Sequence, residues 1–170
     1  MTKIPQKEAK LLDLFKLIDI ESKTHRHEPL HSVQDSQKLR GNIEGAHCKN
    51  LFVKDKKSGL WLIVTLEDTK IDLNKLAKLL KVGRFSFCSS ETMIEVLGVE
   101  PGSVTPFAVM NNNARNVRIV LDERMLENEV VNYHPLHNSA TTSIKSKDLI
   151  KFLSYYKNDF EIMKIPEKDL

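Results

Sequence analysis

The stretch CKNLFVKDKKSGLWLIVTL, residues 48–66, decides the fold class of this chain. Two runs with high β-propensity, Cys48–Lys54 and Leu60–Leu66, flank the polar segment Asp55–Gly59. Because a short polar segment ending in glycine suits a tight reversal between strands, the pattern predicts an antiparallel β-hairpin. This hairpin is the strongest local prediction that the sequence supports.

Upstream of the hairpin, the apolar residues of Lys7–Ile20 recur at helical spacing, with charged residues on the other face. This pattern predicts an amphipathic helix that packs on a sheet. The segment His25–Pro29 is expected to be extended. Ser32 is then placed to cap a short helix that ends near Gly41.

Downstream of the hairpin, helical spacing predicts a helix over Asp72–Leu80, closed by Gly83 in a left-handed conformation. A short strand is expected over Arg84–Phe87, followed by a serine-capped helix that stops at Gly98. The later predicted elements are a second hairpin made of Pro106–Asn111 and Asn116–Leu121, a short helix from Asp122, a strand ending at His134, a helix capped by Ser146, and an edge strand over Phe160–Ile165.

Hairpins outnumber strand–helix–strand crossovers in this order of elements. We therefore predict an α+β fold with a mixed, mainly antiparallel sheet flanked by helices. The 170 residues, 41% of them hydrophobic, are enough for one sizeable core, so residues 1–170 are expected to form a single domain.

The charge of the chain is nearly balanced, with a formal net charge of +3. That charge permits a nucleic-acid partner without requiring one. The longest strongly apolar stretch, Trp61–Leu66, is too short to span a bilayer, and Met1–Lys10 lacks the apolar core of a signal peptide. We expect a cytoplasmic protein with no membrane partner, whose Cys48 and Cys88 remain thiols.

Several familiar catalytic motifs are missing from the sequence. It contains no GxxxxGK[ST], GxGxxG, HExxH or GxSxG pattern, which argues against P-loop, Rossmann, zincin and α/β-hydrolase chemistry. His25, His27 and His31 lie close together, but no cysteine or acidic ligands accompany them at a recognisable spacing. No metal and no cofactor are therefore expected.

Three segments contain candidate site residues, each with a structural alternative. Lys49, beside Asn50, could reach a phosphate or a carbonyl oxygen, or could simply be solvated at a strand end. The stretch from Gly98 through Pro101 and Gly102 to Ser103 suits close approach to a ligand, or an ordinary helix stop and turn. The polar cluster His134–Asn138 could bind a ligand, or its histidine could bond to backbone.

These segments together resemble a known family. Gly45–Asp55, Leu97–Ala108 and Tyr133–Thr142 are similar, in order and spacing, to the YbaK/ProX aminoacyl-tRNA deacylases, relatives of the editing domain inserted in some bacterial prolyl-tRNA synthetases. The resemblance extends from the first helix to about Phe152 and is greatest to free-standing proteins that deacylate alanyl-tRNA(Pro). It implies that family's editing-domain fold, with a partly barrel-like sheet. One departure is Tyr133, where many relatives have phenylalanine.

The resemblance also implies roles for individual residues. Lys49 would hold the terminal phosphate or sugar and add positive charge near the ester, with Asn50 helping to hold the substrate. The loop containing Gly98, Pro101, Gly102 and Ser103 would turn backbone N–H groups toward the developing oxyanion. His134, with Asn138 nearby in the same motif, would shape a small amino-acid pocket.

The implied reaction is hydrolysis of mischarged tRNA(Pro) by water, assisted by the ribose hydroxyl beside the ester, without metal or protein nucleophile. The implied partners are the tRNA(Pro) acceptor end and, transiently, prolyl-tRNA synthetase. Two alternatives stay open. One is the same chemistry on cysteinyl-, seryl- or threonyl-tRNA; the other is a non-catalytic module that binds tRNA or a synthetase.

Overall fold

The structure, a computed structural model, describes residues 4–29 and 43–169. The helix predicted from Ser32 to Gly41 lies outside the described residues. The strands are β1 (Ser22–Arg26), β2 (Ala46–Lys54), β3 (Leu60–Leu66), β4 (Ser86–Phe87), β5 (Arg118–Asp122), β6 (Val130–Tyr133), β7 (Ala140–Lys145) and β8 (Phe160–Met163). The α-helices are α1 (Gln6–Leu17), α3 (Leu73–Leu79), α4 (Ser90–Thr92), α5 (Glu123–Leu126) and α6 (Ser146–Tyr156).

The hairpin predicted from residues 48–66 is confirmed. β2 and β3 pair antiparallel, with Cys48 opposite Leu66 and Lys54 opposite Leu60. Asp55 stabilises the turn: its Oδ1 accepts the backbone N–H of Gly59 at 2.9 Å and its Oδ2 accepts the indole N–H of Trp61 at 2.9 Å. The turn is therefore fixed by a side chain as well as by the backbone.

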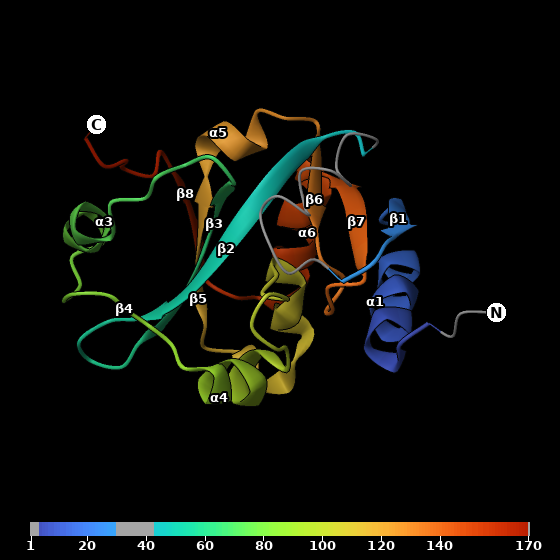
Figure 1. The fold of residues 1–170 in the computed structure, drawn as a ribbon, viewed down its shortest axis with the longest axis horizontal. Helices are drawn as coiled ribbons and strands as arrows, with labels where there is room; N and C mark the ends of the chain where they lie inside the picture. Colours follow the sequence, from blue (N-terminus) through green and yellow to red (C-terminus); the bar gives the residue numbers. More distant parts are fainter. Residues whose placement is uncertain (1–3, 30–42, 170) are drawn as a thin grey trace.

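The strands form one mixed sheet in the order β1-β7-β6-β2-β3-β5-β8, with β4 paired to β2 (Figure 1). Four pairs are antiparallel (β1–β7, β2–β3, β2–β4, β6–β7) and three are parallel (β2–β6, β3–β5, β5–β8). This arrangement confirms the predicted α+β class with a mixed sheet. β1 and β8 are opposite edges of the path, so the described strands do not close into a barrel.

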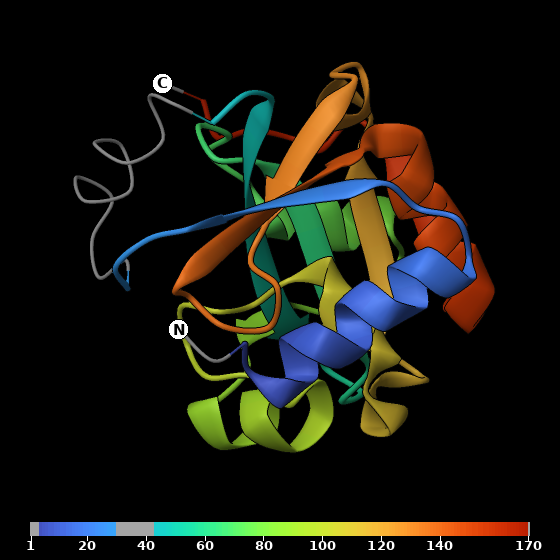
Figure 2. The same cartoon turned by 90° about the vertical axis from the view of Figure 1, so that its right-hand side faces the viewer.

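Helices cover both faces of the sheet. On one face, Phe52, Leu62 and Ile119 belong to a large core with residues of α1 and α6 (Figures 1 and 2). On the other face, the neighbouring Val53 and Ile63 pack in a smaller core with α3. Side chains alternate between the two faces of a strand, which explains why adjacent residues of β2 and β3 enter different cores.

The second predicted hairpin is wrong. Pro106–Met110 is a 3₁₀ turn, η2, because proline is placed in its first turn and the Thr105 side chain accepts the N–H of Phe107 at 3.3 Å. β5 instead pairs in parallel with β3 and β8. A short apolar run is compatible with either a buried strand or a buried helical turn, so periodicity could not decide between them.

Three smaller predictions also need correction. The left-handed residue after α3 is Lys81, with φ of 59°, not Gly83; a Cβ on Gly83 would lie 2.5 Å from the Cβ of Lys56. The N-cap of α6 is Lys145, and no side chain caps this helix, so Ser146 is its first residue. β7 was not predicted, because its polar threonines and serine resemble a loop.

Candidate functional site

The pairing of β2 is interrupted along the edge opposite β3. On this edge β6 pairs with Ala46 and His47, and β4 pairs with Val53 and Lys54. No described strand pairs with the intervening Cys48–Phe52 on this side, although the carbonyl of Phe52 accepts the N–H of Cys88 at 3.1 Å. Unpaired backbone at a sheet edge can bond to another chain or to a ligand. The interruption, which we call the β2 gap, therefore places Lys49 and Asn50 at an opening in the sheet.

Asn50 connects the β2 gap to the glycine-rich loop. Its Nδ2 donates to the carbonyl oxygen of Val104 at 3.1 Å. Its Oδ1 is buried and has no hydrogen-bond partner within the described part of the chain. An unsatisfied buried acceptor costs free energy, so a ligand that donates to it would gain binding energy.

Lys49 projects to the opposite face of the sheet from Asn50, because neighbouring side chains of a strand alternate. It is half-buried, and its side-chain amine has no hydrogen bond or ion pair with other residues of 4–29 and 43–169. Burial lowers the pKa of its amine, while the carboxylates of Asp68 and Glu167 oppose that shift. A partly desolvated cation without a partner is suited to bind an anion or a polarised carbonyl.

The pairing of β2 and β6 relates Lys49 to His134. His47 is opposite Asn132 in this parallel pair. Lys49 lies two residues beyond His47, and His134 lies two residues beyond Asn132. Because side chains alternate along a strand, Lys49 and His134 are expected on the same face of the sheet. Extending this register therefore predicts Lys49 and His134 on one face of the sheet, whereas Asn50, bonded to Val104, lies on the other face.

His134 has one ring nitrogen bonded and one without a partner in the described chain. Its Nδ1 donates to the carbonyl oxygen of Ala140 at 3.0 Å. Burial lowers the pKa of the ring; the Ala140 carbonyl opposes the shift, and His27 and His137 add to it. The neutral ring therefore presents Nε2 as an acceptor. The backbone bond expected as one alternative is therefore present, and it leaves Nε2 available, so ligand binding by His134 stays a prediction.

We predict that His134 titrates below the ordinary histidine value of 6.5 and carries its proton on Nδ1. The folded chain then holds fewer protons at this site than the unfolded chain. Its contribution to stability is present above pH 6.5 and is lost as the pH falls below that value. NMR of ¹⁵N-labelled imidazoles, assigned with a His134→Gln variant, checks the prediction. A pKa of 6.5 or more, or a proton on Nε2, contradicts it.

The predicted glycine loop has two parts with different roles. Gly98 ends the preceding π-helical turn η1 (Met93–Leu97) with φ of 67°, and its N–H donates to the carbonyl of Ile94. Pro101 and Gly102 are exposed, and a Cβ on Gly102 would meet no atom within 4 Å. Ser103 is buried, and its N–H donates to the carbonyl of Glu100 at 3.0 Å. Gly98 thus acts as a helix stop, and the Pro101–Gly102 turn is open to contact.

A cavity of about 290 Å³ brings the glycine loop near the His134–Asn138 segment. Gly98 and Leu136 both line it, together with Lys7 of α1. Asn138 is half-buried, and its side chain has no hydrogen bond to any described residue. The two predicted segments are therefore neighbours across this cavity, although they are distant in sequence.

A buried carboxylate that the sequence analysis missed fixes the same segment. Glu8 of α1 is fully buried and accepts from Arg26 Nη1 at 3.1 Å and from His137 Nε2 at 2.7 Å. Burial alone would raise the pKa of Glu8, but these hydrogen bonds lower it overall. The N–H of Ser139 donates to His137 Nδ1, which fixes the tautomer. No local pattern identifies Glu8, because its partners are distant in sequence.

Glu8→Gln is expected to lower the free energy of unfolding by about 2 kcal/mol, because charge-assisted hydrogen bonds become neutral ones inside the protein. Glu21→Gln, at an exposed position, is the matched control and should change stability by less than about 0.5 kcal/mol. Urea denaturation of both variants measures the difference. Equal stabilities would show that the Glu8 interactions contribute nothing net.

Tyr133, the departure from the family pattern, faces the core. Its hydroxyl donates to the sulfur of Met125 at 3.0 Å, and its ring packs edge-on against Phe107 with centroids 5.6 Å apart. The extra hydroxyl therefore bonds inside the core and does not extend into the site.

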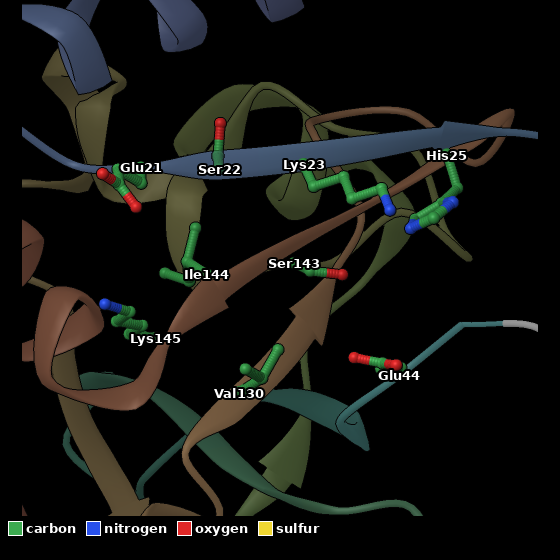
Figure 3. A pocket seen from close by; sticks show the side chains of 9 residues that line it. All are labelled: Glu21, Ser22, Lys23, His25, Glu44, Val130, Ser143, Ile144 and Lys145. Atoms are coloured by element: carbon green, nitrogen blue, oxygen red, sulfur yellow. The ribbon is translucent and has the colours of Figure 1, made fainter.

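A separate hollow of about 370 Å³ is lined by residues of β1, β6 and β7. Figure 3 shows Lys23 and His25 along β1, with Glu44 across the hollow from them. Glu21 and Lys145 add one further charge of each sign. None of the predicted site residues lines this hollow, and its two carboxylates balance its two lysines, so the lining has no excess of positive charge to attract an anion.

The structure adds two further observations on metals and membranes. Among residues 4–29 and 43–169, no group of three or more histidine, cysteine or acidic side chains is arranged to hold a metal ion. His27 instead bonds through Nε2 to Thr141 Oγ1 at 2.8 Å, and His31 lies outside the described residues. No helix in the described part of the chain has the length and hydropathy needed to cross a bilayer.

Comparison with known proteins identifies the family of this chain. The aminoacyl-tRNA editing domain family matches residues 27–152. Prolyl-tRNA synthetase associated domain-containing protein 1 of Bos taurus is 38% identical over 144 residues, which cover 82% of either chain. The prolyl-tRNA editing protein ProX of Acetoanaerobium sticklandii is 31% identical over 142 residues, covering 82% of this chain and 85% of ProX.

The fold also matches a solved structure. A crystal structure described as a candidate trans-editing enzyme for prolyl-tRNA synthetase superimposes with a TM-score of 0.76 at 16% identity. The match covers 98% of this chain and 100% of the other. At that identity the likeness establishes the shared fold.

Proposed function

This chain belongs to the aminoacyl-tRNA editing domain family, and we propose that it is a trans-editing hydrolase that removes alanine from mischarged alanyl-tRNA(Pro). Residues 1–170 would form one editing domain, acting in the cytoplasm on the acceptor end of tRNA(Pro). Any contact with prolyl-tRNA synthetase would be transient. Relatives named for prolyl-tRNA editing and for association with prolyl-tRNA synthetase support the choice of tRNA.

The proposed reaction is hydrolysis of the ester between the amino acid and the terminal ribose. Water attacks the ester carbon, and the ribose hydroxyl beside the ester acts as a relay that takes a proton from the attacking water and passes its own proton to the ester oxygen that leaves. The tetrahedral intermediate then collapses, the carbon–oxygen bond to the ribose breaks, and the leaving oxygen takes up a proton. The products are free alanine and uncharged tRNA, so no protein nucleophile, metal or cofactor is required.

Lys49 has the central role in this proposal. The observation that supports it is the half-buried, unpaired amine at the β2 gap. Positive charge beside the ester stabilises the oxyanion, and it does so more strongly in a partly desolvated site than in water. In the exposed turn of Pro101 and Gly102, the N–H of Gly102 would supply a backbone donor to the ester or to the ribose, because Pro101 has no N–H and that of Ser103 already donates to Glu100.

The other predicted residues would bind and select the substrate. Asn50 Oδ1 and His134 Nε2 are acceptors that suit the ammonium group and the ribose hydroxyls, and Asn138 lies in the same segment as His134. Gly98 would act by ending η1 and so positioning the turn. Alanine is smaller than proline, so a synthetic site for proline cannot strongly exclude it, whereas a small second site can exclude proline.

The test is release of alanine from alanyl-tRNA(Pro) by the purified protein, beside prolyl-tRNA(Pro) and a chelator control. Rapid, chelator-insensitive loss of alanine alone supports the proposal. Hydrolysis of cysteinyl-, seryl- or threonyl-tRNA in its place would reassign the substrate. Tight binding of tRNA without hydrolysis of any ester would replace the enzyme with a binding module.

A further inference from the structure

A cavity of about 480 Å³ extends from Lys49 along the face of the sheet that α3 covers. Its lining combines apolar side chains of β2 and β4 with lysines from two loops. The lining residues that matter here are Lys49, Leu51, Lys70, Asp72, Phe87 and Lys168. The proposed function uses Lys49 at one end of this cavity and leaves the rest of it unexplained.

Phe87 forms an exposed aromatic surface at the other end. Its side chain is 62% exposed, although β4 holds its backbone opposite Val53 of β2. Phe85, two residues earlier, is buried, with its ring 5.9 Å from that of Trp61. Phe87 therefore lies on the same face but outside the packed core. An exposed ring on a fixed backbone is a surface on which a nucleobase can stack.

The lysines come together because the C-terminal segment pairs with the loop before α3. The N–H of Lys168 donates to the carbonyl of Lys70 at 2.8 Å, and the backbone of Glu167 forms an isolated antiparallel β-bridge with Ile71. Both lysine side chains are exposed. With Lys49 they contribute three positive charges to the lining of one cavity.

One acidic side chain lines the cavity, and others lie beside it; Asp169, next to Lys168, pairs with Lys75 at 3.7 Å. Asp72 is the one carboxylate in the lining, and its Oδ1 accepts the N–H of Lys75 at 3.0 Å as the cap of α3. Glu167, whose charge opposes the lowering of the Lys49 pKa, also forms an ion pair with Arg124 at 3.4 Å. Asp68 is the other carboxylate that acts on Lys49. Positive charge therefore predominates in the lining and favours an anionic occupant.

We propose that this cavity binds the unpaired nucleotides that precede the terminal adenosine of the tRNA, with a base stacked on Phe87 and phosphates beside Lys70 and Lys168. This assignment rests on the proposed function, which places the ester at Lys49. Phe87 pairs with a residue four positions along β2 from Lys49, a separation of about 13 Å along the strand. A short single strand can bridge that distance while its backbone follows the lysines.

The first test compares two substrates that share the same ester. Alanyl-tRNA(Pro) has the preceding nucleotides, and the alanyl ester of adenosine lacks them. Phe87→Ala should lower kcat/KM for alanyl-tRNA(Pro) by about tenfold, as loss of one base–aromatic stack does, and leave the adenosine ester unchanged. Tyr155 is an exposed aromatic residue on α6 outside this lining, so Tyr155→Ala is the matched control. It should leave kcat/KM unchanged for both substrates.

The second test measures binding without catalysis. Fluorescence anisotropy follows a single-stranded RNA oligonucleotide that ends in CCA, over a range of salt concentrations. The double variant Lys70→Ala, Lys168→Ala should reduce the slope of log K against log salt by about 1.4, the value for two lost phosphate contacts on a single strand. Lys147→Ala, an exposed lysine on α6, should leave the slope unchanged.

The outcomes separate failure of this inference from failure of the proposed function. If Phe87→Ala lowers kcat/KM equally for alanyl-tRNA(Pro) and the adenosine ester, or does not lower it for alanyl-tRNA(Pro), the role of Phe87 is overturned. An unchanged salt slope would overturn the role of the two lysines. If the wild-type protein hydrolyses neither ester, the proposed function fails, and the anisotropy measurement still decides whether the cavity binds RNA.

Discussion

Lys49→Ala is expected to reduce kcat for alanyl-tRNA(Pro) hydrolysis by about 100- to 1,000-fold, the usual cost of removing a group that stabilises an oxyanion. The loss should be mainly in kcat, because the charge on the oxygen develops in the transition state. The free energy of unfolding should change by less than about 1 kcal/mol. The side-chain amine of the lysine makes no hydrogen bond or ion pair within the described chain, so its removal breaks no contact of that kind.

Lys54→Ala is the matched control for this experiment. Lys54 is on the same strand but is exposed and opposite Ser86, away from the β2 gap. It should retain wild-type turnover. Single-turnover kinetics with labelled alanyl-tRNA(Pro) measures the rate of hydrolysis, and urea denaturation measures the free energy of unfolding. Turnover of Lys49→Ala within threefold of wild type would remove Lys49 from the mechanism.

Phe107→Ala is expected to lower the free energy of unfolding by about 4 kcal/mol, as large-to-small changes of buried phenylalanine do. Phe107 is fully buried, and its ring centroid lies 5.3 Å from that of Phe15 and 5.5 Å from that of Phe152. The residue thus joins η2 to α1 and α6, and its removal leaves a cavity where three elements meet. Edge-to-face ring pairs add to the loss.

Thermal and urea denaturation of Phe107→Ala measures this change. Phe107→Leu should lower the free energy of unfolding clearly less than Phe107→Ala, because most of the buried volume is kept. Ile162→Ala, on the exposed side of the edge strand β8, should cost less than about 1 kcal/mol. A loss below about 1.5 kcal/mol for Phe107→Ala would mean that the core relaxes around the missing ring.

Elements whose signals are local were predictable. The β2–β3 hairpin, the helix α1 and the helix stop at Gly98 follow from alternation, helical spacing and glycine, each of which acts between near neighbours in sequence. Pro106–Met110 and β7 were not predictable in this way. An apolar run and a threonine-rich run take their conformation from the surfaces that they pack against.

The candidate site shows the same division. Lys49, Asn50 and His134 were identified from the sequence as residues with the right chemistry in segments that resemble an editing family. Which of them share a face depends on the pairing of β2 with β6, which joins segments far apart in the chain. Glu8 is satisfied as a buried carboxylate by Arg26 and His137, which reach it from two other segments.

The sequence by itself thus determined the fold class, the family and the residue types available for chemistry. The tertiary structure decided which side chains are desolvated, unpaired or brought together. The β2 gap, the unsatisfied Asn50 acceptor and the cavity joining Lys49 to Phe87 and Lys168 are examples. Burial and pairing are properties of contacts between distant segments, so no local pattern of residues encodes them.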